Sequence, residues 1–138
     1  MNQLVSYEEA VTVTKISNQI KVTVFPEYLE NHSFPEKNSY AFSYTVTIEN
    51  LGLTPVQLLS RHWYINSGGG EYMEVKGEGV VGEKPHIMAN QGYRYSSGAM
   101  IKDPVGQMHG KYTFKSLDGD SFDVEIPTFD LIYPHLLH

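Results

Sequence analysis

The sequence contains no cysteine, which excludes disulfide bonds, thiolate nucleophiles and zinc sites built from thiolates. Basic residues are also few: 10 Lys and Arg stand against 16 Asp and Glu, which gives a net charge of −6. Because proteins that bind nucleic acid neutralise phosphates with Lys and Arg, this balance argues against a nucleic-acid partner. No apolar run approaches the roughly 20 residues that span a bilayer, so we expect no membrane segment.

The N-terminal residues lack the basic and apolar stretches of a secretory signal, so we expect a cytoplasmic protein. The chain has 138 residues, of which 41% are hydrophobic and 19% charged. This size and composition are typical of one globular domain, and we predict a single domain over residues 1–138. The 10 Tyr and 6 Phe suit the pleated surfaces of strands.

Alternating apolar and polar residues predict strands through most of the chain. Residues 40–49 give the clearest pattern, and residues 11–24 predict a hairpin, followed by an exposed loop at 25–38. Residues 56–65 are apolar on both faces in parts, which predicts a central strand or a β-bulge. Shorter strands are expected at residues 72–75, 80–81, 93–100, 111–115 and 122–126. No segment longer than ten residues favours helix, so the fold class predicted is all-β, an antiparallel β-sandwich.

Residues 77–82, Gly-Glu-Gly-Val-Val-Gly, have the G-x-G-x-x-G lettering of a dinucleotide-binding turn. Such a turn holds a pyrophosphate at the N-terminus of a helix. Here Pro85 follows and no apolar residues recur with a period of 3.6, so we predict that the backbone stays extended past Gly82. Glycines in β proteins commonly mark tight turns or close backbone approach. Successive amides in a turn can also form a concave site for an anion, and both alternatives stay open.

The anion hypothesis assigns phosphate or pyrophosphate to a set of glycines and basic residues. Its candidate anion-binding residues are Gly77, Gly79, Gly82, Arg61, His62 and Lys84. Glu78 and Glu83 lie in the same segment and would repel an anion. For Arg61 the alternative is a structural ion pair, because a buried arginine is seldom left unpaired.

Motifs for catalysis or metal binding are weak. Of the six histidines, only His135 and His138 are close in sequence, so we predict no metal site and no cofactor. Ser97-Gly98 lacks the preceding glycine of a nucleophile elbow. We therefore predict no catalytic residue and no enzyme, and we expect Trp63 in the core.

A binding module is the function that the remaining features favour. Tyr93 and Tyr95 share one face of a predicted strand, and Met108 lies nearby in sequence. Aromatic residues and methionine are enriched at protein interfaces, and sheet edges accept added strands. We predict Tyr93, Tyr95 and Met108 as interface residues and another protein as the partner, with the chain itself a monomer or a homodimer.

Five blocks of sequence resemble the ApaG family in order and spacing. They are residues 56–63, 77–85, 95–98, 104–112 and 126–131, and the likeness runs from about residue 7 to residue 131. The resemblance implies a fold similar to fibronectin type III or immunoglobulin domains. The loops at residues 66–70 and 89–92 depart from the family pattern.

The resemblance to the ApaG family also bears on function. Bacterial members, also called CorD, are linked to cobalt and magnesium homeostasis, and in eukaryotic proteins the domain looks like a protein-binding module. The same glycine lettering in the family implies a hypothesis of nucleotide or pyrophosphate binding. The family supplies no catalytic residue that could be carried over to this sequence.

Overall fold

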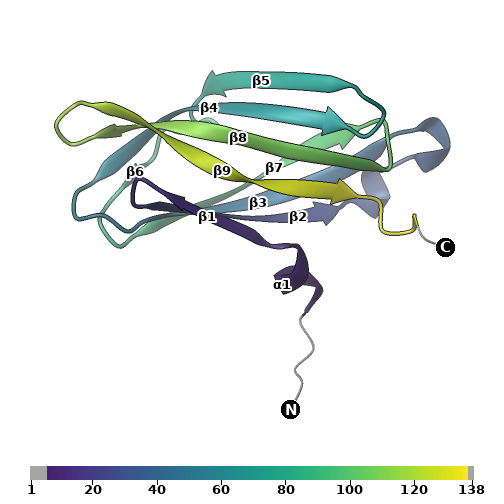
Figure 1. Cartoon of the computed structure of the whole chain (residues 1–138), viewed down its shortest axis with the longest axis horizontal. Coiled ribbons are helices and arrows are strands. Elements are labelled where there is room, and N and C mark those ends of the chain that lie inside the picture. Colours follow the sequence, from purple (N-terminus) through teal and green to yellow (C-terminus); the bar gives the residue numbers. More distant parts are fainter. Residues whose placement is uncertain (1–5, 137–138) are drawn as a thin grey trace, which may run out of the picture.

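Two antiparallel β-sheets pack face to face in the computed structural model, which describes residues 6–136 (Figure 1). The first sheet has the order β1-β2-β3-β7 and contains β1 (Val13–Ser17), β2 (Ile20–Tyr28), β3 (Tyr40–Asn50) and β7 (Gly92–Ile101). Each neighbouring pair in it is antiparallel. The predicted antiparallel β-sandwich is therefore confirmed.

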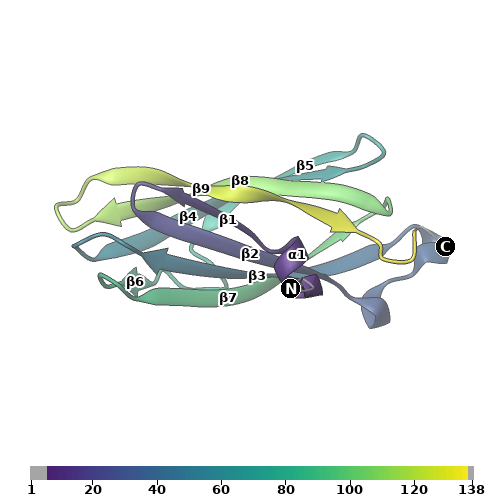
Figure 2. The same ribbon diagram turned by 60° about the horizontal axis from the view of Figure 1, so that its bottom comes forward.

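The second sheet has the order β5-β4-β8-β9, with a short strand attached at one end. It contains β4 (Val56–Ser67), β5 (Tyr72–Glu78), β6 (His86–Ile87), β8 (Val105–Ser116) and β9 (Ser121–Ile132), and β6 pairs with the beginning of β4. Figure 2 shows the two sheets as layers, with β8 and β9 above the strands of the first sheet.

The core lies between the layers because each strand turns its apolar residues to the same side. In β3 the residues Tyr40, Phe42, Tyr44, Val46 and Ile48 are all buried, as their alternation predicts. Each fully buried residue of this kind stabilises the fold by about 1.5–3 kcal/mol relative to an exposed one. The facing sheet supplies Leu58, Trp63, Met108, Tyr112, Phe114, Val124, Phe129 and Leu131.

A β-bulge in β4 decides which side chains of that strand enter the core. The register with β8 shifts between Leu58 and Ser60. Before the bulge Leu58 is buried, and after it Trp63 and Ile65 are buried, so the inward parity changes from even to odd residues. The bulge thereby turns Arg61 toward the interior. The prediction of a central, bulged strand is confirmed.

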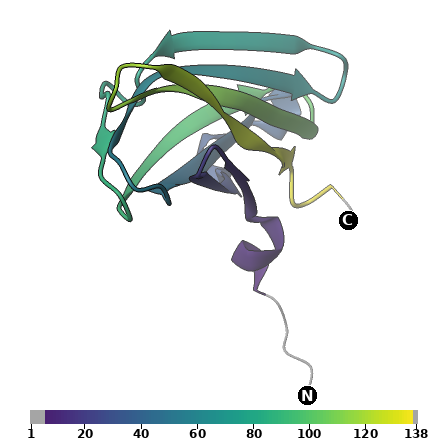
Figure 3. The ribbon, with the colours of Figure 1, turned by 60° about the vertical axis from the view of Figure 1, so that its left-hand side comes forward.

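The N-terminal part differs from the prediction. Residues Tyr7–Val11 form a short helix, α1, and the prediction that Val11 begins a strand is wrong. The side chain of Ser6 caps this helix by accepting a hydrogen bond from the backbone N–H of Glu9 at 3.1 Å. Figure 3 shows α1 outside the two layers, leading into β1.

The loop expected at residues 25–38 begins later than predicted, because β2 continues through Pro26 to Tyr28. β1 pairs with β2 only as far as Val24, so the missing N–H of Pro26 removes no bond on that side. The rest of the loop contains two short 3₁₀ turns, η1 (Glu30–His32) and η2 (Pro35–Lys37). Within residues 6–136, no helix has the length and hydropathy needed to cross a membrane.

Candidate functional site

The glycine segment forms a tight hairpin turn after β5. Val80 and Glu83 exchange two backbone hydrogen bonds, Val80 N to Glu83 O at 2.8 Å and Glu83 N to Val80 O at 2.9 Å. The two residues between them have positive φ, 43° at Val81 and 82° at Gly82, as a type I′ turn requires. No helix begins at Gly82, which confirms that the lettering marks a turn. The strand predicted at residues 80–81 is only this isolated bridge.

Two of the glycines are required by what lies beside them. Gly79 has φ +60°, and a Cβ added there would lie 2.2 Å from the carbonyl oxygen of Glu83. At Gly77 a Cβ would lie 2.7–2.8 Å from the guanidinium atoms of Arg61. The absence of a side chain at Gly77 therefore makes room for Arg61 to lie flat against β5.

Arg61 is tied to the backbone of the glycine segment. One Nη donates hydrogen bonds to the carbonyl oxygens of Glu78 and Gly79, both at 2.9 Å. No carboxylate within residues 6–136 forms an ion pair with it, so the expected structural ion pair is wrong. Because backbone carbonyl groups carry no net charge, these hydrogen bonds leave the positive charge of Arg61 without a negative partner.

A cavity of about 260 Å³ opens beside this guanidinium, between β7 and the glycine turn. Its walls include Arg61, Tyr44, Trp63, Tyr95 and Ser97, which come from both sheets. The hydroxyl of Tyr95 also shares a hydrogen bond with that of the buried Tyr112. The cavity thus combines the guanidinium of Arg61 with several hydroxyl groups, and Glu78, which is paired with Lys84, also lines it.

The tyrosines of this cavity remain neutral. Burial raises the pKa of Tyr44, with smaller opposing effects from the Ser97 hydroxyl and Arg61. Burial likewise raises the pKa of Tyr95 and of Tyr112 well above the ordinary value for a phenol. Neutral hydroxyls beside a guanidinium suit an anionic group, since all of them can donate hydrogen bonds to it.

The other basic candidates lie apart from Arg61. His62 lies on the outer face of β4, where its Nε2 is 2.5 Å from Glu74 Oε1 and its ring stacks on Tyr64 at 4.5 Å between centroids. Lys84 forms an ion pair with Glu78 and so neutralises one of the acidic residues of the segment. The structure brings the three glycines and Arg61 together, with Lys84 nearby, and leaves His62 on the opposite face.

The predicted interface residues are less accessible than a binding surface needs. Met108 is fully buried in β8, so its side chain cannot meet a partner and its prediction as an interface residue is wrong. Tyr95 is 7% exposed and lines the cavity at Arg61. Tyr93 is partly buried against the core. The pattern of Tyr93 and Tyr95 on one face identifies the inner face of β7, not an outer one.

Sequence reasoning missed Tyr44 and Ser97 as cavity residues. Tyr44 belongs to the regular alternation of β3, which identifies it only as a core residue. Ser97 is flanked by small residues that show no pattern. The two meet Arg61 only because the sheets pack together, and no local signal could have found that.

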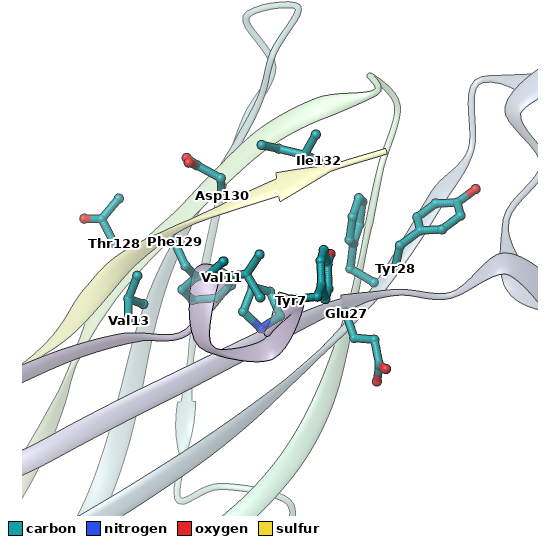
Figure 4. A pocket seen from close by; sticks show the side chains of 12 residues that line it. Tyr7, Val11, Val13, Glu27, Tyr28, Thr128, Phe129, Asp130 and Ile132 are labelled. Atoms are coloured by element: carbon teal, nitrogen blue, oxygen red, sulfur yellow. The ribbon is translucent and has the colours of Figure 1, made fainter. Parts of the chain in front are cut away.

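A second cavity, of about 280 Å³, lies at the other side of the sandwich between α1, β2 and β9. Figure 4 shows Tyr7 and Val11 of the helix lying across from Phe129 and Ile132 of β9. Its walls are largely apolar and carry no cation. Within residues 6–136 no group of three or more His, Asp or Glu side chains could hold a metal ion, and His138 lies outside that range.

Comparisons with known proteins agree with this architecture. A family model described as the ApaG domain matches residues 30–116. Protein ApaG of Klebsiella pneumoniae (strain 342) is 51% identical over 122 residues, which cover 88% of this chain and 98% of that protein. Protein ApaG of Enterobacter sp. (strain 638) is 47% identical over the same shares of both chains. A crystal structure of a Bordetella pertussis protein named ApaA is 39% identical, with a TM-score of 0.82 over 84% of this chain and 94% of that one.

Proposed function

The chain belongs to the ApaG domain family, and from this premise we propose that it is a non-catalytic binding module whose partner is another protein. The names of its relatives describe no enzymatic activity. The site described above offers an anion a cation and neutral hydroxyls, without a paired nucleophile and base. These observations favour binding over catalysis.

The free edge of β7 is the observation that carries this proposal. β7 ends the order of its sheet, and no other strand in the described part of the chain pairs with its outer side. It pairs with β3 from Gly92 to Ile101 without a register shift, so the edge is regular. Its central residues, Ser96 to Ala99, are small and uncharged. A long edge without a charge, proline or bulge at its centre favours the addition of another strand.

Capture of partners with an edge-blocking variant tests the proposal. We expect Ala99→Lys to abolish capture of a protein retained by the tagged wild-type chain, because an inward-facing charge on an edge strand opposes pairing. Ile16→Lys, on the exposed edge strand β1 at the opposite side, is the matched control and should keep the partner. Equal capture by both variants would contradict the proposal.

A second candidate function is the binding of phosphate or pyrophosphate at Gly77, Gly79 and Gly82. The charge of Arg61, which has no acidic partner in the described residues, supports it. Phosphorus NMR and calorimetry with pyrophosphate test it, with Arg61→Gln as the variant and Lys76→Gln as the control on the outer face. Gly79→Val is a poor probe, because the added side chain would collide with Glu83. Affinity that is unchanged in Arg61→Gln would exclude the site.

The proposal also covers where the protein acts and how it relates to metal homeostasis. We place the protein in the cytoplasm and propose that the family's link to cobalt and magnesium homeostasis acts through the bound partner. Thermal unfolding with and without CoCl₂ or MgCl₂ tests the second point. A rise in Tm that saturates at micromolar metal would show direct binding and contradict it.

A further inference from the structure

Two cavities of different character border the free edge of β7. The first is the polar cavity at Arg61, already described. The second, of about 140 Å³, lies farther along the same strands and is lined by Ile65, Tyr72, Met73, Met100 and Ile101 among others. Both cavities lie between β4 and β5 of one sheet and β7 of the other.

Apolar side chains make up most of the lining of the second cavity, and the ion pair of Glu71 with Lys102 also lines it. Tyr72, Met73 and Met100 are 58%, 49% and 56% exposed, while Ile65 and Ile101 close the floor. Methionine side chains are unbranched and adapt to the shape of an apolar partner. This cavity therefore fits a large aliphatic or aromatic side chain.

On β4 and on β7, the spacing between one inward-facing residue of the first cavity and one of the second is four residues. In β4 it runs from Arg61 to Ile65, and in β7 from Ser97 to Ile101, which is four residues in each case. The register of β5 agrees, since Arg61 pairs with Gly77 and Ile65 with Met73. At about 3.3 Å per residue, four residues span roughly 13 Å along a strand.

An extended peptide added to β7 would have the same spacing. Side chains of a strand alternate between its faces, so residues i and i+4 point to the same side and lie roughly 13 Å apart. A peptide in register with β7 thus reaches both cavities with two side chains, while its backbone pairs with the edge.

Charge complementarity defines the side chain for the polar cavity. Arg61 has no acidic partner among residues 6–136, and the nearby Glu78 is matched by Lys84. A carboxylate is the peptide group that can pair with the guanidinium of Arg61.

We propose that the partner supplies an extended peptide that adds to β7, with an acidic side chain at Arg61 and a large apolar side chain four residues away between Met73 and Met100. This inference rests on the proposed function and specifies its partner. The peptide runs along the seam between β5 and β7.

Selection from a display library of random nonapeptides tests this inference on the full chain. On the wild-type protein we expect enrichment of Asp or Glu four residues from Leu, Ile, Met or Phe. The acidic preference should vanish on Arg61→Gln and persist on Lys76→Gln, which removes an equal charge from the outer face. Calorimetry with a selected peptide should show an affinity loss of about tenfold or more in Arg61→Gln, as expected for a charge-assisted hydrogen bond.

Three further variants keep the test decisive if Arg61→Gln disturbs the turn. Arg61→Lys retains the charge and should restore part of the acidic preference. Met100→Ser should remove the apolar preference alone, whereas Met88→Ser, at an equally exposed methionine outside both cavities, should leave it unchanged. A preference for acidic residues that is the same on all Arg61 variants would overturn the inference.

The outcome separates this inference from the proposed function. If no nonapeptide is enriched, or if enriched peptides lack the four-residue spacing, the peptide inference fails. Loss of a full-length partner in Ala99→Lys would then still support strand addition at β7. Amide shifts in NMR spectra that fall on β1 and β9 instead of β7 would contradict both.

Discussion

The two long seams of this sandwich, where the edges of the sheets meet, are built differently. At the seam between β1 and β9, Lys15 forms an ion pair with Glu125, and the backbone N–H of Glu125 donates to Ser17 Oγ at 3.0 Å. Asn18 Nδ2 donates to the carbonyl oxygen of Asp123 at 2.7 Å. Across the seam between β5 and β7 the ion pair of Lys102 with Glu71, at 3.5 Å, lies at one end, and two cavities lie along the seam.

This difference between the two seams indicates where the fold can accept a partner. Edge strands carry backbone groups that need hydrogen bonds, and at β9 the side chains of Ser17 and Asn18 provide two of them. At β7 the same groups face solvent. The core beneath both seams is continuous, so the seams differ in their edges and not in their packing.

The largest expected effect tests that continuity. Phe129 of β9, at the closed seam, is 2% exposed, and its ring lies 5.8 Å from Tyr44 and 5.9 Å from Trp63, which line the open-seam cavity. We expect Phe129→Ala to lower the free energy of unfolding by about 3–5 kcal/mol, measured by urea denaturation. Phe122→Ala, at a partly buried position, should cost less. Equal losses of unfolding free energy in the two variants would mean that the two seams do not share one core.

The next effect concerns the turn at the open seam. Gly79→Ala combines a positive φ with a Cβ that would lie 2.2 Å from Glu83 O, so we expect a loss of about 2 kcal/mol or more. Gly119→Ala, at the tip of the β8–β9 turn, has φ +96° but no atom within 4 Å of the added Cβ. It should cost only the backbone strain of about 1–2 kcal/mol. Thermal unfolding of both variants separates the cost of the steric collision at Gly79 from the cost of backbone strain alone.

Val81 should give an effect of opposite sign. It is a β-branched residue at φ 43°, a conformation that such residues rarely adopt. Val81→Asn supplies the Asn-Gly pair that type I′ turns favour, and we expect it to stabilise the fold by about 1 kcal/mol. Val81→Thr keeps the branching and should give no gain. A lower Tm for Val81→Asn than for wild type would show that Val81 makes a contact worth more than its strain.

The sequence was sufficient to predict elements whose pattern is local and periodic. The alternation of residues 40–49 predicts β3, and the strand expected at residues 122–126 lies within β9. The helix α1 was missed because five residues are too few for a period of 3.6 to appear. Its signal is Ser6 followed three residues later by Glu9, the spacing of a capping box.

The candidate site could be predicted only in part. The glycine lettering identifies the turn. Arg61 could be proposed as a basic residue of the same site, and the β4–β5 pairing places it beside Gly77. The position of the bulge after Leu58 decides that Arg61 points inward and His62 outward, and a bulge is set by packing against β8. Met108 was misassigned for a related reason, since methionine suits a core as well as an interface.

The smallest expected effect lies at the closed seam. Asp123 accepts a hydrogen bond from Thr113 Oγ1 at 2.9 Å and another from Lys111 Nζ at 3.3 Å. The Thr113 hydroxyl, and after it Lys111, hold the pKa of this carboxyl below its usual value. The ionised form is therefore favoured by folding, and its stabilisation is present above the unfolded pKa of about 4 and is lost as pH falls through the folded pKa.

Because the Asp123 side chain is 53% exposed, solvent and salt screen this contribution to about 0.5 kcal/mol or less. We expect Asp123→Asn to lower the free energy of unfolding by that amount at pH 7 and by nothing at pH 2. Thr113→Val should remove most of the same pH-dependent increment, since it deletes the leading cause of the lowered pKa. Urea denaturation between pH 2 and 7 measures both. A difference that grows toward low pH would reverse the sign assigned to Asp123.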